Sequence, residues 1–203
     1  MQIIKNIEQG TNEWLSLRLG VATASNFNKI ITSKGEESDQ LKGYALSLAT
    51  DIFLINPEEG YKSESMIKGN ILEPLARQAY QEETLEFVEQ ITMFKSDCGN
   101  FGYSPDGLVG NNGLLETKNP DSKTHFKYII ENKVPSIYIP QLQGGLWVSE
   151  REWIDFVSYG HNFKEKQLLI IRVYRDEKFI SELAKLAQKT IEIRDNFVKQ
   201  FRG

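Results

Sequence analysis

One short segment, residues 104–118, constrains the fold of this chain more than any other. It reads Ser-Pro-Asp-Gly-Leu-Val-Gly-Asn-Asn-Gly-Leu-Leu-Glu-Thr-Lys. The Gly-Asn-Asn-Gly run lies between apolar pairs, which is the pattern of a β-hairpin turn. Pro105 cannot donate a hydrogen bond to a central ladder, so we expect an edge or a bulge at this point. Leu114 and Leu115 indicate that the second strand enters the core.

This hairpin carries three ionisable side chains, Asp106, Glu116 and Lys118. Residues two apart in a strand point to one face, so Glu116 and Lys118 should project side by side. Carboxylates can hold Mg²⁺, a Lewis acid that activates water, while an adjacent ammonium positions that water or offsets developing negative charge. The Asp-x(n)-Glu-x-Lys pattern is typical of metal-dependent nucleases. The competing interpretation is a solvated ion pair on an ordinary hairpin, because 26% of the chain is charged and such triplets also arise by chance.

Composition narrows the class of protein. A chain of 203 residues that is 40% hydrophobic can form one domain, 1–203, with a sizeable core. The net charge of −4 argues against a protein that simply coats DNA, although it allows a local basic groove. Cys98 is the single cysteine, which fits a reducing compartment. We see neither the apolar core of a signal peptide nor a membrane-spanning run, so we expect a cytoplasmic protein, in the host cell if phage-encoded.

The pattern of apolar residues predicts a mixed α and β protein. Helices are expected near 11–17, from Thr23 through Ile31, over 41–53, 66–83, 136–149 and 176–202, and a loop over 33–40. Strands are expected at 87–94, 153–159 and 168–174, with the hairpin at 101–119. Central strands flanked by helices indicate an α+β fold, an α/β sandwich.

Glu73 lies along the inward side of an apolar stripe on the predicted 66–83 helix. An ionised carboxylate in that place needs a partner or a metal ion. The ordinary alternative is a pair with Arg77 at i+4 that reaches water. Glu73 joins a metal site only if its helix packs beside the hairpin.

A second polar cluster, Gln141 and Gln143, interrupts the apolar segment 138–148. Pro140 suits a first helical turn, and Gly144-Gly145 would permit the close approach of another backbone. These amides either point into a cleft, with Tyr138 on the face of Gln141, or are satisfied within an ordinary core.

Taken together, four blocks resemble the lambda-exonuclease type of phage recombination nuclease, the YqaJ group of the PD-(D/E)XK nucleases. They are Glu13-Trp-Leu-Ser-Leu-Arg-Leu-Gly-Val-Ala-Thr-Ala-Ser25, Gly69-Asn-Ile-Leu-Glu-Pro-Leu-Ala76, Ser104-Pro-Asp-Gly107 with Glu116-Thr-Lys118, and Tyr138 through Val148. The blocks occur in the family's order and extend from residue 13 to residue 148. The joint match is far more specific than the Asp/Glu/Lys triplet alone.

The resemblance implies a restriction-endonuclease-like core, a central mixed β-sheet flanked by helices, with a Mg²⁺ centre. Asp106 and Glu116 resemble the metal-binding carboxylates, and the main-chain carbonyl of Thr117 a further ligand. Glu73 resembles the helix-borne acid that helps to hold a second Mg²⁺. Lys118 resembles the lysine that orients the attacking water. Mn²⁺ is expected to substitute for Mg²⁺.

Further site residues follow from the same resemblance. Gln141 matches the family's active-centre glutamine and Tyr138 a neighbouring tyrosine. Arg18, Ser25 and Ser104 resemble the pocket that grips a 5′-phosphate at a DNA end. A guanidinium offers a bidentate fork to phosphate, and Ser25 would donate from a helix start that favours anions. His125 and His161 fall in no block, and we expect them to be structural or surface residues.

The activity implied is digestion of one strand of duplex DNA from 5′ to 3′, which leaves a 3′ overhang for recombination. The resemblance also implies a ring-shaped homotrimer around DNA and a partner single-strand annealing protein. Two alternatives stay open on the residues. One is an endonuclease or junction resolvase of the same fold, and the other is a non-catalytic module that binds DNA ends or protein.

Overall fold

The computed structural model describes residues 1–57 and 64–203, and of residues 64–68 and 70 only the main chain. The helices are α1 (Asn12–Leu17), α2 (Leu41–Asp51), α3 (Glu64–Thr84), α4 (Ser122–Glu131), α5 (Ile139–Ser149) and α6 (Glu177–Arg202), with 3₁₀ helices η1 (Ala24–Lys29) and η2 (Ser136–Tyr138). The strands are β1 (Gln2–Ile4), β2 (Ala22–Thr23), β3 (Val88–Glu89), β4 (Met93–Lys95), β5 (Phe101–Tyr103), β6 (Gly107–Val109), β7 (Gly113–Lys118), β8 (Trp153–Tyr159) and β9 (Leu168–Tyr174).

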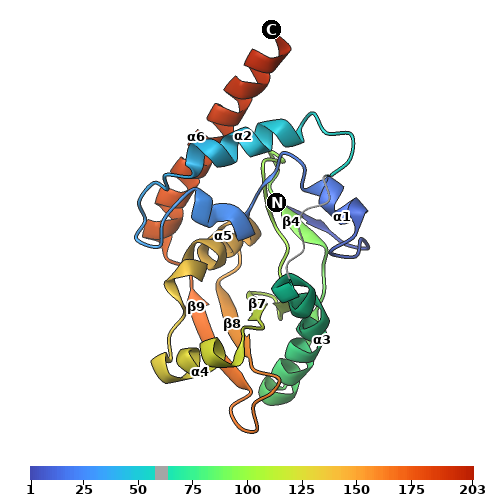
Figure 1. Ribbon diagram of the computed structural model, residues 1–203, viewed down its shortest axis with the longest axis vertical. Helices are drawn as coiled ribbons and strands as arrows, with labels where there is room; N and C mark the ends of the chain where they lie inside the picture. Colours follow the sequence, from blue (N-terminus) through green and yellow to red (C-terminus); the bar gives the residue numbers. More distant parts are fainter. Residues whose placement is uncertain (58–63) are drawn as a thin grey trace.

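The strands form two sheets. The smaller one has the order β1-β4-β5-β2, and the larger one the order β3-β6-β7-β8-β9. In the larger sheet β7 and β8 are parallel, whereas the other neighbours are antiparallel. Helix α3 covers one side of this sheet and α4 lies on the other (Figure 1). The expected mixed sheet flanked by helices is therefore confirmed.

The second strand of the predicted hairpin, β7, is the middle strand of the larger sheet. Its two leucines are fully buried on opposite faces, as the alternation of a strand requires. Leu114 belongs to the main core, and Leu115 packs in a smaller cluster with Tyr80 of α3. Both faces of β7 are covered, so the polar residues that follow Leu115 also enter the interior.

The segment 87–94 differs from its prediction, because it forms two strands, β3 and β4, in different sheets. Between them, the hydroxyl of Thr92 donates to the carbonyl of Ile7 and accepts from its amide. These contacts tie the crossing point to the N-terminal segment. A single periodic run in the sequence could not reveal that its halves pair with different partners.

Helix α4 was not predicted, and the segment after Thr23 is a short 3₁₀ helix instead of an α-helix. The α4 helix begins at a side-chain cap, since Asp121 accepts from the amide of Thr124. The predicted loop 33–40 is confirmed, and a salt bridge from Lys189 of α6 to Glu37 at 2.6 Å holds it. In the described residues, no helix combines the length and apolar character that crossing a bilayer requires.

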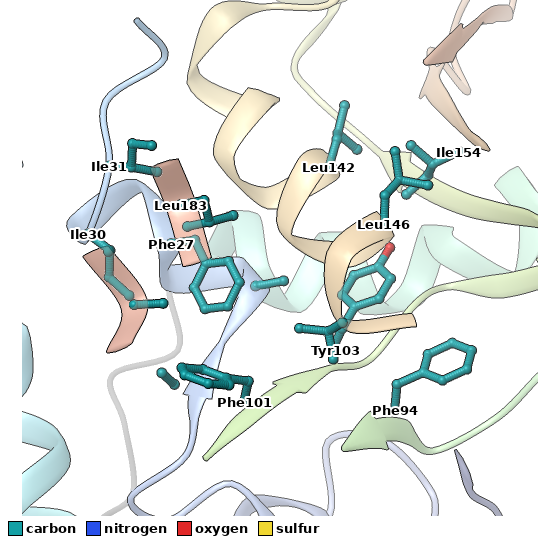
Figure 2. Packing of buried hydrophobic residues seen from close by; sticks show 14 of the residues in the cluster. Phe27, Ile30, Ile31, Phe94, Phe101, Tyr103, Leu142, Leu146, Ile154 and Leu183 are labelled. Atoms are coloured by element: carbon teal, nitrogen blue, oxygen red, sulfur yellow. The ribbon is translucent and has the colours of Figure 1, made fainter. Parts of the chain in front are cut away.

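Helix α5 packs unusually close to its neighbours through two adjacent glycines. A Cβ atom at Gly144 would lie 2.1 Å from the ring of Phe27, and one at Gly145 would lie 2.8 Å from the ring of Tyr103. Figure 2 shows both rings beside this helix, together with Leu142 and Leu146. The predicted close approach thus occurs, although the groups that approach are aromatic rings and not another backbone. It fixes α5 against η1 and β5.

Replacing Gly144 with alanine should lower the free energy of unfolding by about 2 kcal/mol, because the added methyl group overlaps the Phe27 ring in a packed core. Urea unfolding followed by circular dichroism measures this change. The matched control is Gly43→Ala in α2, where an added Cβ meets nothing within 4 Å in the described structure. Alanine there should stabilise the protein by up to about 1 kcal/mol. Equal stability of both variants would contradict the packing argument.

Candidate active site

The site forms where β6 stops and β7 continues. The pairing of β6 with β7 ends at Gly107 opposite Leu115, whereas β7 pairs with β8 as far as Lys118. Asp106 occupies the open edge. Its carboxylate oxygen Oδ2 accepts from the amide of Thr117 at 2.6 Å and from the Thr117 hydroxyl at 2.8 Å. The edge that Pro105 predicted therefore places a carboxylate beside the end of the central strand.

Glu116 is the buried centre of the site, with only 2% of its surface exposed. Lys118 donates to its Oε1 at 2.6 Å, and Gln141 of α5 donates to the same oxygen at 2.5 Å. The hydroxyl of Tyr103, on β5, donates to Oε2 at 2.8 Å. Three donors from three elements thus satisfy one buried carboxylate, and the predicted common face of Glu116 and Lys118 is confirmed.

The two contacts that the sequence left open for Glu73 both occur: an ion pair with Arg77 and packing of its helix beside the hairpin. Glu73 pairs with Arg77 at 3.1 Å, and α3 packs against β7. Its carboxylate lies close enough to Asp106 to raise the pKa of that residue. The structure therefore places the helix of Glu73 beside the strand that carries Glu116, near enough for Glu73 to act electrostatically on Asp106.

The electrostatics of the cluster are unusual. Burial raises the pKa of Asp106 to about 8, and the charges of Glu116 and Glu73 add to this effect while Lys118 opposes it. Burial lowers the pKa of Lys118, but Glu116 and Asp106 outweigh burial and raise it above its ordinary value. Lys118 is consequently a cation at neutral pH.

The oxygen donors at this edge fit a hard divalent cation such as Mg²⁺. In the described residues, no three His, Cys, Asp or Glu side chains stand close enough together to enclose a metal ion by themselves. Mg²⁺ commonly takes one or two carboxylates and completes its octahedron with water and phosphate oxygens. The N–H and C=O groups of one strand residue point to the same side, so the Thr117 carbonyl lies on the same edge of β7 as its amide, which donates to Asp106. A cation would also relieve the repulsion between Asp106 and Glu116.

A pocket of about 160 Å³ adjoins the carboxylates. Arg18 donates to the hydroxyls of Thr23 and Ser25, each at 3.2 Å, and the indole N–H of Trp14 donates to Ser104 at 3.0 Å. The pocket is lined by Gln9, Trp14, Arg18, Thr23, Ala24, Ser25, Tyr103, Ser104 and Gln141. All three residues predicted to grip a phosphate therefore lie in one cavity.

The parallel pairing of β2 with β5 builds this pocket. Because their carboxyl ends meet at one edge, Ser25 after β2 and Ser104 after β5 come together. Arg18 ends α1 and stacks on Trp14, with the guanidinium carbon 4.2 Å from the ring centroid. Burial lowers the pKa of Arg18. The cation is thus held by a ring and two hydroxyls inside a partly enclosed space.

Sequence reasoning missed Tyr103, Trp14, Thr23 and Gln9 as lining residues. Trp14 lies one helical turn before Arg18, a spacing that could have indicated the stacking. Tyr103 directly precedes Ser104, but its contact with Glu116 depends on tertiary packing.

The structure also locates three other residues that the sequence singled out, Tyr138, Gln143 and His125. The ring of Tyr138 lies 5.3 Å from the Lys118 ammonium, beside the site. Gln143 instead bonds the main chain at Tyr174 and Asp176, so it satisfies the core. His125 is buried, with one ring nitrogen on the Ser158 hydroxyl and the other on the Lys166 carbonyl. Its contacts hold α4 to β8 and to the loop after it.

Comparison with known proteins agrees with this geometry. The sequence model of the YqaJ-like viral recombinase domain matches residues 13–152. The chain belongs to this family. No curated protein sequence matches the chain. The YqaJ-like assignment confirms the resemblance carried by the four sequence blocks.

Solved structures place this YqaJ-like chain among nuclease folds. An alkaline exonuclease from Laribacter hongkongensis, LHK-Exo, is 31% identical with a TM-score of 0.86, over 95% of this chain and 96% of that one. A structure of LHK-Exo with dAMP gives 30% identity and a TM-score of 0.85, over the same shares of both chains. A phage-related exonuclease from Haemophilus somnus 129PT shares the fold, at 18% identity and a TM-score of 0.69 over 89% and 96% of the two chains.

Without divalent cations, the ionised form of Asp106 should destabilise the folded protein. The native pKa of about 8 exceeds the ordinary 3.8, so the native chain binds a proton that the unfolded chain releases. The free energy of unfolding should therefore fall as the pH rises between these values. Asp106→Asn keeps an acceptor for Thr117 and should be more stable than wild type by more than about 1 kcal/mol at pH 8.

Denaturant unfolding in EDTA at several pH values measures this difference, which should shrink toward pH 4. The control is Asp121→Asn, which changes the exposed helix cap of α4. The pKa of Asp121 is lowered by its bonds to Thr124, so its contribution should be constant above about pH 5. A difference between Asp106→Asn and wild type that does not vary with pH would contradict the electrostatic argument.

Proposed function

We propose that this YqaJ-like protein, acting as one nuclease domain over residues 1–203, is a Mg²⁺-dependent exonuclease. It digests one strand of double-stranded DNA from a 5′-phosphorylated end in the 5′-to-3′ direction and leaves a 3′ single-stranded overhang for recombination. One observation carries this proposal: the carboxylate site and the Arg18 pocket share two residues, Tyr103 and Gln141. A pocket for a terminal phosphate beside a phosphodiester-cutting site is what removal of nucleotides from an end requires.

The relatives support the class of substrate. LHK-Exo is described as an alkaline exonuclease and has been solved with dAMP, a deoxynucleoside monophosphate. Such a molecule is the chemical unit that an exonuclease releases from DNA. The family model spans residues 13–152, a range that includes the carboxylate site and every pocket residue except Gln9.

In the proposed mechanism, Asp106, Glu116 and the Thr117 carbonyl would hold one Mg²⁺, and Glu73 would help to hold a second. Bound Mg²⁺ supplies Lewis-acid chemistry, polarising the scissile phosphate and acidifying the attacking water. Lys118 stays cationic, so it orients that water and offsets the charge that develops on the phosphate. Gln141 and Tyr103 fix the orientation of Glu116 from opposite oxygens. Tyr138 flanks the Lys118 ammonium.

Arg18, Ser25 and Ser104 would grip the 5′-phosphate. Arg18 offers N–H groups that now bond the hydroxyls of Thr23 and Ser25, and an entering phosphate can take over or share these donors. The pocket is partly enclosed, which favours a chain end over an interior phosphate. The endonuclease or resolvase alternative would not require such a pocket. The non-catalytic alternative does not account for the presence of both carboxylates and the lysine at the sheet edge.

The test uses linear duplex DNA with a 5′-phosphate on one strand and a 5′-hydroxyl on the other, each strand carrying a different internal label. Wild type with Mg²⁺ should degrade the phosphorylated strand first, and EDTA should abolish the reaction. Lys118→Ala should reduce the rate by roughly 10²- to 10³-fold, since it removes charge stabilisation at the reacting phosphate. Equal loss of both strands, or cutting of closed circular DNA, would indicate the endonuclease. No digestion with any metal would indicate the binding module.

Arg18→Ala in the same assay separates the pocket from the catalytic centre. Loss of a charged hydrogen bond of about 1.5–3 kcal/mol should reduce the preference for the phosphorylated strand by roughly 10- to 100-fold. The matched control is Arg202→Ala, an exposed arginine at the end of α6. An unchanged strand preference in Arg18→Ala would contradict the phosphate assignment.

We further propose that the chain works as a ring-shaped homotrimer around DNA, with a phage single-strand annealing protein as partner. A closed ring would keep a chain of net charge −4 on DNA because topology replaces part of the electrostatic attraction. Gel filtration with light scattering should give a mass of about three chains, and a monomer at working concentration would refute the ring.

A further inference from the structure

Arg77 contacts two proposed metal ligands, Glu73 and Asp106, but is not itself one of the proposed catalytic residues. Its Nη1 donates to Oε1 of Glu73 at 3.1 Å and to the main-chain carbonyl of Asp106 at 2.9 Å. The Arg77 side chain is only 12% exposed, against 29% for Glu73. With the Gln90 amide in the orientation that satisfies its partners, its oxygen also accepts from both terminal nitrogens of Arg77. The guanidinium is therefore held on several sides.

An arginine suits this place better than a lysine. Its planar fork presents several N–H groups at fixed angles, so it can bond acceptors on different elements at once. Glu73 lies one helical turn before Arg77 on α3, whereas Asp106 lies in the link between β5 and β6. The guanidinium consequently joins the helix to the link through two bonds of defined direction.

This junction determines where the Glu73 carboxylate lies. Glu73 and Glu116 each disfavour ionisation of Asp106, and a partly exposed glutamate without a counter-ion would turn toward water. Arg77 opposes that movement, because it is anchored on the carbonyl of Asp106 itself. Binding of a cation by Glu73 and Asp106 would depend on the spacing of their carboxylates, and residues that orient metal ligands commonly change metal affinity when they are replaced.

We propose that Arg77 is a positioning residue that fixes the Glu73 carboxylate beside Asp106 and thereby sets the affinity for the second divalent cation. The inference rests on the proposed function, since it takes these carboxylates as cation ligands. Arg77 acts through Glu73 and Asp106 and does not itself touch the substrate.

The experiment is a calorimetric titration of the full chain with Mn²⁺ alone, without DNA. Wild type should bind two ions. Arg77→Met, which keeps the length and removes the charge and the fork, should keep the tighter ion and bind the weaker one roughly 10- to 100-fold less tightly. Arg77→Lys keeps the charge but loses the planar fork, whose two terminal nitrogens also hold the Gln90 oxygen, so it should also bind the weaker ion less tightly than wild type.

The matched control is Tyr80→Phe on the same helix. The Tyr80 hydroxyl donates to the buried Asp155 of β8 at 2.7 Å, so its removal loosens α3 from the sheet without touching Arg77. Tyr80→Phe should bind both ions like wild type, although it unfolds at lower denaturant concentration. Circular dichroism establishes that each variant is folded before titration.

Each outcome separates the inference from the function. If Arg77→Met binds both ions with wild-type affinity, the positioning role is overturned and the nuclease proposal stays intact. If the methionine variant does not fold, the same result in Arg77→Lys decides the question. Tighter binding of Mn²⁺ by Arg77→Met would show that the guanidinium competes with the cation. That result would also overturn the positioning role. An equal loss in Tyr80→Phe would indicate general loosening of α3 and overturn a specific role. Wild type that binds no Mn²⁺ overturns both proposals.

Discussion

The burial of one ionised carboxylate, Glu116, in the middle strand of the larger sheet is the constraint on which the rest of the structure depends. A charge in such a place is strongly unfavourable unless donors surround it. The donors come from three elements: Tyr103 from β5, Lys118 from β7 itself and Gln141 from α5. Both sheets and α5 must therefore keep fixed positions relative to the two carboxylate oxygens of Glu116. The glycine contacts of α5 with Phe27 and Tyr103 provide the close packing that this requires.

The same donors connect the carboxylate site to the neighbouring pocket. Tyr103 and Gln141 each touch Glu116 and also line the cavity that contains Arg18. A group bound in that cavity would lie at a distance from Glu116 that is set by rigid elements and not by a loop. In an enzyme that acts on chain ends, such a constant distance fixes which bond meets the catalytic groups. Recognition of the end and hydrolysis would thus depend on one set of contacts.

The carboxylate cluster at the end of β7 also opposes the stability of the fold. Burial, together with the charges of Glu116 and Glu73, raises the pKa of Asp106 and so disfavours a further negative charge at this edge. Two cations, Lys118 on Glu116 and Arg77 on Glu73, offset part of this effect. The remaining imbalance is the physical basis on which we propose a divalent cation at this edge. Perturbed carboxylates of this kind are common where a protein binds charge in order to act.

The sequence by itself determined the features that depend on local periodicity and local chemistry. The strands at 153–159 and 168–174, the hairpin and the long terminal helix agree with their predictions. The common face of Glu116 and Lys118 followed from strand alternation alone, and the four sequence blocks indicated the family before any contact was known.

Tertiary structure decided which elements meet. It divided 87–94 between two sheets and formed α4 after the Asp121 cap. It also brought Tyr103 to Glu116. Glu73 gained a partner in Arg77, which also bonds the carbonyl of Asp106. Periodicity fixes the side of its own helix or strand on which a residue lies. It does not fix which other element packs against that side, because that choice depends on contacts between residues far apart in the chain.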